Sequence, residues 1–509
     1  MNVASLLVRV GEERPDLTLS VADAEISMAR AVGAAGHVAG ALSEAGLRPG
    51  DTIVLQGTNS LPWIVFWMAS QLAGLQVVLM NPDYPDDLVG LLVDDLGDAA
   101  LATEGLVIGS SLRHIDFTGA VGGTLLVDGD PVESGSRHMP GVERDPLDTA
   151  TLMYTSGTSG LPKLCAQSHR YLVELGRYVA DTFCMSPLDS VFAPLPLFHI
   201  NPLGYGLLGA LSGLSDFVTV PRFSASGFWP TVVDRNITAL ILHGPPVEIL
   251  LKAGTPAPAH DVRIAFFANQ AFLERFAVPL GVTGYGSTEF GGLTHTHLWR
   301  AGEMVHLPEG MTALAGQPRR GVGWRITDDG EIQLREHVPG LFLTGYLRAG
   351  VVSPPPSDDG WISTGDRGRD ADGDLIFVER LAESVRMRGE YVPLAYLDAS
   401  FAALDGVEEA SVWTTDSGDG LVAYIVGSPS PEAVSALLED LPTFMRPAWL
   451  VRTDSLPRDP GVGKVQRRRL GEVTQLERRP LGDPLRRPTP RRGETGHSKT
   501  THHGRSGDA

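Results

Sequence analysis

The sequence predicts an α/β protein whose large N-terminal part is built on helix-covered, mainly parallel sheets. Between residues 20 and 150, helical patterns alternate with short apolar runs, beginning with an Ala-rich helix over 26–45 and a strand over 52–56. At 509 residues the chain is too long for one compact core, so we expect two or more domains. A hydrophobic fraction of 43% with 20% charged residues is typical of a globular enzyme.

Residues 61–80 are mostly apolar and approach the length of a membrane span. Polar residues such as Gln71 interrupt this stretch, however. Ser60, which is followed closely by a proline, marks a helix start, and Gly74 marks a helix stop. We therefore expect a buried helix followed by a strand over 77–80, and no membrane span.

Charge and cysteine content exclude several classes of partner. The formal net charge of −20 argues against a nucleic acid or an anionic membrane surface as the main partner. The chain has two cysteines, Cys165 and Cys184, which leaves no disulfide framework and no cysteine metal site. The first fifteen residues lack the apolar block of a signal peptide. These features together predict a cytoplasmic protein.

A loop rich in glycine and hydroxyl groups follows the apolar run 150–154, which has the size of a buried strand. Its six residues are Thr155, Ser156, Gly157, Thr158, Ser159 and Gly160. Glycines allow backbone N–H groups to approach an anion, and each hydroxyl adds a donor. Lys163 supplies a positive charge, and Pro162 suggests the first turn of a helix over 164–179, whose N-terminus would favour an anion.

This pattern predicts a polyphosphate-binding loop, although the composition alone would also suit a flexible linker. Only two residues separate Gly160 from Lys163, so the loop is not a Walker A motif. The residue after the second glycine is Leu161, and the Gly-x-Ser-x-Gly pattern of serine hydrolases is therefore absent.

The ten residues from Tyr154 to Lys163, Tyr-Thr-Ser-Gly-Thr-Ser-Gly-Leu-Pro-Lys, resemble the signature loop of the adenylate-forming superfamily. This superfamily contains acyl-CoA synthetases, the adenylation domains of peptide synthetases and beetle luciferases. Its further motifs follow in order, so the resemblance covers roughly residues 20–470. It implies that ATP, with Mg²⁺, activates a carboxylic acid, and the chain is closest in type to the stand-alone acid–CoA ligases.

The resemblance also implies a domain organisation. Residues 1–379 would form an N-terminal adenylation domain that binds ATP and the acid, including a β-rich subdomain. Residues 380–474 would form a small, mobile α+β domain on a hinge. We interpret the Arg-, Pro- and Gly-rich residues 475–509 as a disordered tail. Within the large domain, residues 370–373 predict a tight turn and 374–378 the last strand before the hinge.

Pro-Leu-Phe-His, ending at His199, resembles a core motif whose histidine borders the carboxylate substrate and can gate the acyl and pantetheine channels. A lone histidine near aromatic residues is more often structural. The resemblance instead assigns substrate contact to His199 and places Asn201, Leu203 and Tyr205 near the acid pocket. No aspartate stands where peptide-synthetase domains hold a substrate ammonium, so an α-amino acid is a less favoured substrate.

Gly-Tyr-Gly-Ser-Thr-Glu, ending at Glu289, and Thr-Gly-Asp, ending at Asp366, resemble two further nucleotide motifs. Tyr285 can stack on adenine, Thr288 can donate to the α-phosphate, and Glu289 can supply a hard oxygen to Mg²⁺. The resemblance implies that Asp366 accepts hydrogen bonds from both ribose hydroxyls. The glycines expected beside the substrate are Gly284 and Gly286.

The resemblance assigns two more residues to the nucleotide. Arg380 matches an arginine that contacts it at the domain junction, although Ala382 stands where relatives carry a polar hinge residue. Residues 388–392 match a segment of the pantetheine tunnel. Lys464 matches the lysine that reaches the carboxylate and the α-phosphate during adenylation. By its type alone, Lys464 would be a solvated surface charge.

The sequence therefore predicts an enzyme that forms an acyl-adenylate from ATP and a small carboxylic acid, releases pyrophosphate and transfers the acyl group to CoA. One alternative keeps the adenylation and changes the acceptor to a separate carrier protein, an amine, or nitrite in a diazotisation. Another is a nucleotide-binding protein without turnover. The acid itself and the oligomeric state do not follow from the residues.

Overall fold

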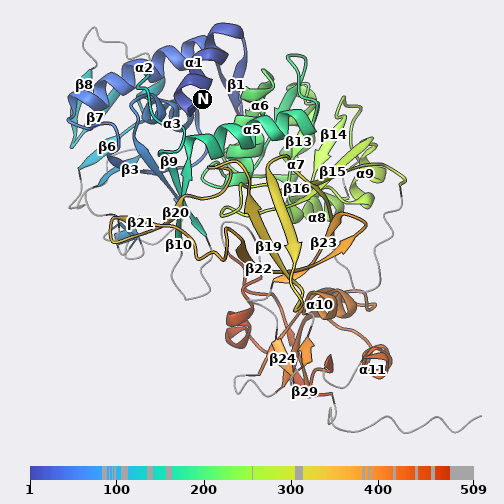
Figure 1. Cartoon of the computed structure of the whole chain (residues 1–509). Helices are drawn as coiled ribbons and strands as arrows, with labels where there is room; N and C mark the ends of the chain where they lie inside the picture. Colours follow the sequence, from blue (N-terminus) through green and yellow to red (C-terminus); the bar gives the residue numbers. More distant parts are fainter. Residues whose placement is uncertain are drawn as a thin grey trace, which may run out of the picture. The chain divides into compact units, whose positions relative to one another are not determined.

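The computed structural model describes most of the chain (Figure 1). The described residues are 1–82, 89–90, 92–93, 96, 99–104, 113–133, 141–155, 163–254, 256–303, 313–380, 385–387, 390–392, 394–415, 420–441, 445–459, 463 and 465–481. The chain divides into two compact units, Met1–Ser384 with Arg458–Lys464, and Val385–Pro457 with Val465–Ala509. None of the helices in the described part is both long and apolar enough to span a membrane.

The first sheet of the large unit is parallel in its centre and antiparallel at both edges. The described strands, in spatial order, are β21 (Val351–Ser353), β20 (Gly345–Arg348), β10 (Lys163–Ser168), β9 (Thr149–Thr155), β4 (Gln76–Met80), β3 (Thr52–Gln56), β5 (Ala99–Thr103), β6 (His114–Asp116), β7 (Thr124–Val127) and β8 (Asp130–Glu133). Strands β9, β4, β3, β5 and β6 run parallel to one another. β10 is antiparallel to both β9 and β20, which places the hairpin β9–β10 inside the sheet.

The second sheet joins a parallel half to an antiparallel half. Its described strands, in spatial order, are β18 (Val322–Ile326), β19 (Glu331–Glu336), β22 (Ile362–Ala371), β23 (Asp374–Arg380), β17 (Ala313–Pro318), β16 (His295–Arg300), β15 (Leu280–Tyr285), β14 (Ile264–Phe266), β13 (Ala239–Ile241), β11 (Ser190–Phe192), β12 (Asp216–Thr219), β1 (Thr18–Val21) and β2 (Ala24–Ser27). The expected β-rich part is therefore present, and it continues the parallel half through β16 and β17.

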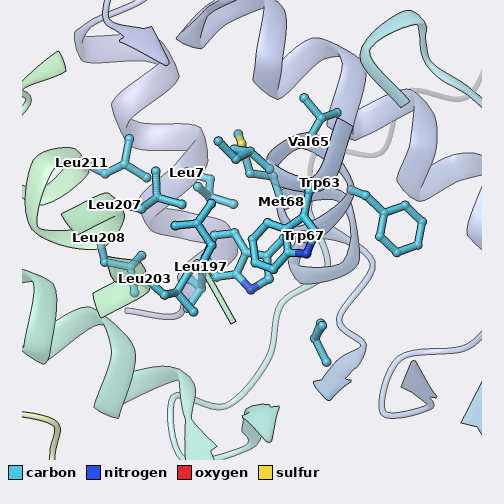
Figure 2. Close-up of a cluster of buried hydrophobic side chains, with 14 of the residues drawn as sticks. Leu7, Trp63, Val65, Trp67, Met68, Leu197, Leu203, Leu207, Leu208 and Leu211 are labelled. Atoms are coloured by element: carbon cyan, nitrogen blue, oxygen red, sulfur yellow. The ribbon is translucent and has the colours of Figure 1, made fainter. Parts of the chain in front are cut away.

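Helix α3 (Leu61–Leu72) explains the membrane-length apolar stretch. Ser60 is its N-cap and accepts a hydrogen bond from the Trp63 N–H (3.1 Å), and Gly74, with φ +73°, follows its end. All faces of the helix are covered, because it lies in the main core of the unit. Figure 2 shows its side chains in one cluster with leucines of the segment that follows Leu197: Trp63, Val65, Trp67, Met68, Leu203, Leu207, Leu208 and Leu211.

The remaining helices of the large unit lie over the sheets (Figure 1). They are α1 (Val3–Glu13), α2 (Met28–Glu44), the short η1 (Ala120–Gly122), α5 (His169–Thr182), the π-helix η2 (Asn201–Leu208), α6 (Gly209–Ser212), α7 (Ala225–Asp234), α8 (Gly244–Ala253) and α9 (Gln270–Phe276). Helices α1, α2, α3 and α5 enclose the core cluster drawn in Figure 2.

The helix predicted over 164–179 is wrong in its first part. Residues 163–168 form strand β10, because Leu164, Cys165 and Ala166 pair with β9 on one side and β20 on the other and are buried there. Helix α5 begins only at His169, after the N-cap Ser168. Its N-terminus therefore does not adjoin the predicted phosphate loop, which removes one expected source of positive potential there.

The small unit is α+β. It contains the hairpin β24 (Val385–Met387) and β25 (Glu390–Val392), helices α10 (Leu394–Ala402), α11 (Pro431–Asp440) and η5 (Arg467–Glu472), and a sheet in the order β26 (Val407–Thr414), β27 (Leu421–Gly427), β28 (Trp449–Thr453) and β29 (Glu477–Pro480). Its core is an apolar cluster that includes Leu397, Phe401, Ile425 and Leu450.

Strand β29 corrects the prediction of a disordered tail from residue 475. It pairs antiparallel with β28, the Arg478 guanidinium lies 4.5 Å from the Trp449 ring, and Glu477 forms an ion pair with Arg452 (2.9 Å). Residues 482–509 lie outside the described part of the chain. The predicted domain limits at 379 and 474 stay predictions.

Removing residues 476–509 should destabilise the small unit, whereas removing 482–509 should not. The longer deletion exposes the edge of β28 and leaves several backbone groups without their partners, each costing about 1 kcal/mol. For a unit of this size we expect a fall in melting temperature of roughly 10 °C. Thermal unfolding of both truncated chains, with hydrogen exchange at the β28 amides, checks this. Equal protection of β28 in the two chains would contradict it.

Candidate functional site

Lys163 lies at the base of the predicted phosphate loop. It is the first residue of β10 and pairs with Thr155, the last residue of β9, so these two residues close the loop. Ser156, Gly157, Thr158, Ser159 and Gly160 lie outside the described residues. The Lys163 ammonium lies 5.2 Å from the centre of the Tyr346 ring, which β20 places opposite Cys165.

Thr288 and Glu289 lie on a tight loop that follows β15, which we call the Glu289 loop (residues 287–292). The N–H groups of Phe290 and Gly292 both donate to the Ser287 carbonyl (3.1 and 2.9 Å). Gly286 makes this turn possible, because a Cβ at this position would lie 2.1 Å from the Gly292 oxygen. Thr288 and Glu289 are half-buried and therefore open to a ligand.

The Glu289 carboxylate has no hydrogen-bond or ion-pair partner among the described residues. Burial, and then the charge of Glu289, raises the pKa of Tyr346. Glu289 is therefore close enough to act on the same tyrosine that Lys163 overlies. Lys163 and Glu289, whose carboxylate has no partner in the part of the chain that the structure describes, thus both lie near the Tyr346 ring.

Tyr285 and Asp366 form the predicted adenosine end of the site. The Tyr285 hydroxyl donates to the Asp366 carboxylate (2.8 Å), and both residues are buried. Asp366 lies on β22, directly opposite Arg380 on β23. The predicted turn at the end of this hairpin is present: Asp370 accepts a hydrogen bond from the Gly373 N–H (2.7 Å). The hairpin therefore brings the backbones of two predicted nucleotide residues together.

Helix η2 reaches the Glu289 loop from another direction. The Tyr205 hydroxyl donates to the Gly292 carbonyl (2.7 Å), and its ring meets the Phe266 ring edge-on at 5.1 Å. Burial raises the pKa of Tyr205, so its hydroxyl remains a donor. Asn201 donates to the Leu242 carbonyl (3.2 Å), while its Oδ1 is buried without a hydrogen-bond partner among the described residues.

The structure thus gathers many of the predicted site residues around the Glu289 loop. Tyr285 and Gly286 lead into it, Thr288 and Glu289 are part of it, Tyr205 donates to it, and Lys163 adjoins it through Tyr346. Gly284 lies within β15 and His199 immediately precedes η2. The described part of the chain does not include Lys464, Ala382, residues 388–389 or the side chain of Arg380.

The residues present fit Mg²⁺ with few protein ligands. A half-buried carboxylate without a partner is the donor type that this hard cation prefers. In the part of the chain that the structure describes, no cluster of three or more His, Cys, Asp or Glu side chains could hold a metal ion. The Glu289 site therefore suits a cation that keeps substrate phosphates and waters as its other ligands.

The family model described as "AMP-binding enzyme" matches residues 8–345, well over half of the chain. The chain belongs to the family of AMP-binding enzymes. This result confirms the resemblance derived from the sequence motifs. The match ends at the beginning of β20 and therefore includes the hairpin with Lys163 and the Glu289 loop, but not Asp366 or Lys464.

Relatives of this AMP-binding enzyme include two bacterial ligases. The chain is 28% identical to a methyl-dioxo-octahydroindenyl-propanoyl:CoA ligase of Rhodococcus jostii, over 92% of this chain and 98% of the relative. It is 32% identical to sulfoacetate–CoA ligase of Cupriavidus necator, over 63% and 66%. The o-succinylbenzoate CoA synthetase of Bacillus subtilis in complex with ATP and magnesium superposes with a TM-score of 0.77 at 23% identity, covering 92% and 99%. This structural match confirms the predicted fold class.

Sequence reasoning missed two residues at the site. Tyr346 adjoins Lys163, and Tyr171 donates to the Thr288 carbonyl (3.0 Å). Neither residue carries a local pattern, because each depends on contacts with distant segments.

His295 should remain neutral far below its usual pKa. It lies opposite Tyr285 on β16, accessible to no solvent, and its Nδ1 bonds to the Thr294 hydroxyl (3.0 Å). Burial lowers its pKa to about 3. In the unfolded chain this histidine takes up a proton near pH 6.5, whereas in the folded chain it does so only near pH 3. As the pH falls from 6.5 to 3, the free energy of unfolding should therefore decrease by about 1.4 kcal/mol per pH unit.

Histidine ring signals in NMR test this directly. The His295 resonance, assigned by its loss in His295→Phe, should not shift between pH 8 and 5. A His295 midpoint near 6.5 would contradict the burial of the neutral ring.

Proposed function

We propose that this AMP-binding enzyme activates a carboxylic acid with ATP, forms an acyl-adenylate with release of pyrophosphate, and transfers the acyl group to CoA. The observation that carries the proposal is the arrangement around the Glu289 loop. A carboxylate without a partner among the described residues, a lysine near the same tyrosine ring and the Tyr285–Asp366 pair offer the groups that a magnesium-bound triphosphate, a ribose and an adenine need. The names of both bacterial relatives describe acid–CoA ligases, which supports the same chemistry.

The nucleotide is held at two points in this proposal. Tyr285 supports the adenine ring, and its hydroxyl keeps the Asp366 carboxylate oriented toward the ribose hydroxyls. At the other end, the backbone and hydroxyls of residues 155–160, together with Lys163, hold the phosphates. Arg380, opposite Asp366, completes the nucleotide contacts. These assignments give the loop residues, Lys163, Tyr285, Asp366 and Arg380 separate places along ATP.

In the first step a carboxylate oxygen of the acid attacks the α-phosphorus, and the bond from that phosphorus to the α,β-bridging oxygen breaks. Pyrophosphate leaves with the bonding electrons. Two anions must meet, so positive groups lower the barrier: Lys163, the Thr288 hydroxyl as donor to the α-phosphate, and Lys464. Mg²⁺, held by Glu289 and the phosphates, would neutralise charge on the triphosphate. His199, Asn201 and Tyr205, with Gly284 and Gly286, border the acid.

In the second step the thiol sulfur of CoA attacks the acyl carbon of the adenylate, the thiol proton passes to solvent or a base, and AMP leaves. The resemblance supports a rotation of the domain predicted over residues 380–474, which withdraws Lys464 and presents residues 388–392 before this step. Other acceptors remain as alternatives: a carrier protein, an amine, or nitrite.

Acid-dependent exchange of labelled pyrophosphate into ATP tests the first step. A panel of aryl, short-, medium- and long-chain acids should contain at least one that supports exchange, and the active acid should then consume CoA and release AMP in equal amounts. Exchange without CoA consumption would favour another acceptor. No exchange with any acid, although ATP binds, would favour the non-catalytic alternative.

Lys464→Ala should lower acid-dependent exchange by at least about 100-fold, because it removes a charge from the developing negative centre. ATP affinity should change little, since Lys464 acts mainly on the reacting groups. Lys252→Ala, which removes an exposed lysine in the last turn of α8, serves as a control with normal exchange. Unchanged exchange in Lys464→Ala would contradict the assigned role.

Asp366→Asn should weaken AMP binding by about 10-fold, because an amide replaces a charge-assisted acceptor of ribose hydrogen bonds. The matched control is Asp370→Asn, an exposed aspartate at the end of the same strand. Titration calorimetry with AMP measures both variants. Equal affinities of the two variants would rule out Asp366 as the ribose acceptor.

A further inference from the structure

The carbonyl groups of the Glu289 loop are bonded to donors from distant elements. The Thr288 carbonyl accepts from the Tyr171 hydroxyl (3.0 Å) and from the Gln167 amide (3.5 Å), and the Glu289 carbonyl accepts from the Leu343 N–H (2.9 Å). On the far side of the loop, Tyr205 donates to Gly292. The backbone that carries the Glu289 carboxylate is therefore fixed from several directions.

Tyr171 is the strongest of the side-chain donors to Thr288 and is itself rigidly placed. It is the third residue of α5, and its N–H donates to the hydroxyl of the N-cap Ser168 (3.1 Å). Its side chain is fully buried, and burial raises the pKa of its hydroxyl, which therefore remains a donor. Gln167, the penultimate residue of strand β10, is equally buried.

These contacts link the Lys163 hairpin to the Glu289 loop. Gln167 and Tyr171 follow Lys163 along the same strand and the helix after it. The Thr344 N–H donates to the Ala166 carbonyl (2.8 Å), so the segment that bonds Glu289 through Leu343 also bonds β10. A closed set of hydrogen bonds thus connects the two parts that the proposed mechanism needs at a fixed separation.

We propose that Tyr171 is a positioning residue that acts through the Thr288 carbonyl to orient the Glu289 carboxylate toward ATP-bound magnesium. The inference rests on the proposed function, because it takes Glu289 as the magnesium ligand. Tyr171 touches neither nucleotide nor metal. Its hydrogen bond restricts the backbone conformations of the Glu289 loop before the ligand binds. Binding therefore costs less conformational entropy at the carboxylate.

Tyr171→Phe removes this hydroxyl and keeps the buried ring. One neutral hydrogen bond of ordinary length corresponds to roughly a 3- to 10-fold change in an equilibrium constant. We expect the dissociation constant of ATP measured with Mg²⁺ to rise by that factor. The dissociation constant of adenosine, which has no phosphates, should stay unchanged.

Tyr178→Phe is the matched control. Tyr178 lies on the same helix and is half-buried. Its hydroxyl bonds to Thr296 of β16 (2.7 Å) and not to the Glu289 loop, so the variant also loses one hydroxyl hydrogen bond. Its ring, which the Arg319 guanidinium overlies at 5.6 Å, is retained in phenylalanine. Both variants should therefore lose some stability. The fall in affinity for ATP with Mg²⁺ should appear only in Tyr171→Phe, because only its hydroxyl bonds to the Glu289 loop.

A double-mutant cycle with Glu289→Gln separates positioning from a general effect on the fold. Titration calorimetry of the full chain with ATP and Mg²⁺ measures the four variants. Tyr171→Phe should weaken binding in the wild-type background and have no further effect in Glu289→Gln. Gln167→Met, which removes the weaker donor, should give a smaller loss with the same dependence on Glu289, and it replaces Tyr171→Phe if that variant does not fold.

The outcomes distinguish the two hypotheses. If Glu289→Gln binds ATP and Mg²⁺ like the wild type, the magnesium role in the proposed function is wrong. If Glu289→Gln is impaired but Tyr171→Phe and Gln167→Met bind normally, or are impaired equally in both backgrounds, the positioning role of Tyr171 is overturned.

Discussion

The fixed position of the Glu289 loop is the constraint on which the candidate site depends. The loop leaves β15 in one sheet, while two of its carbonyls are bonded by Tyr171 and Leu343, which lie next to β10 and β20 of the other sheet. A buried carbonyl without a donor costs about 1–3 kcal/mol, so displacing either sheet at this point would be unfavourable. The same bonds that join the sheets of the large unit therefore hold the residues proposed to bind ATP.

Caps, glycines and turn residues correctly predicted the elements whose limits depend on nearby residues in the sequence. The cap at Ser60 and the glycine at 74 delimit α3, and the Asp370–Gly373 turn ends its hairpin as expected. The helix predicted after Pro162 was wrong because pairing of β10 with both neighbours outweighed a proline signal that normally favours a helix start. Strand β29 was missed for the same reason: its arginines are typical of a solvated tail until β28 provides an edge for it.

The site shows the same division. Motifs identified Tyr285, Thr288 and Glu289 because these residues are contiguous in the sequence. They could not identify Tyr346 or Tyr171, since β20 reaches β10 across about 180 residues and α5 reaches the Glu289 loop across more than 100. Such partners depend on strand register, and a shift of one residue would turn Tyr346 to the other face of the sheet. Motif residues are thus predictable, whereas the residues that hold them require the assembled sheets.

Charge decides which ligand this arrangement can accept. The chain carries a net charge of −20, yet charges farther than about 8 Å from the site are largely screened at physiological ionic strength, so the nearby groups govern binding. Among these groups, Lys163 attracts phosphates, but Glu289 repels them. A nucleotide that arrives without a cation would bring its own negative charge against that carboxylate. In the proposed role as a cation ligand, the Glu289 carboxylate, which has no partner among the described residues, favours ATP together with its divalent ion over the free nucleotide. The hydrogen bonds that fix the loop strengthen that preference, because they hold the backbone that carries the carboxylate.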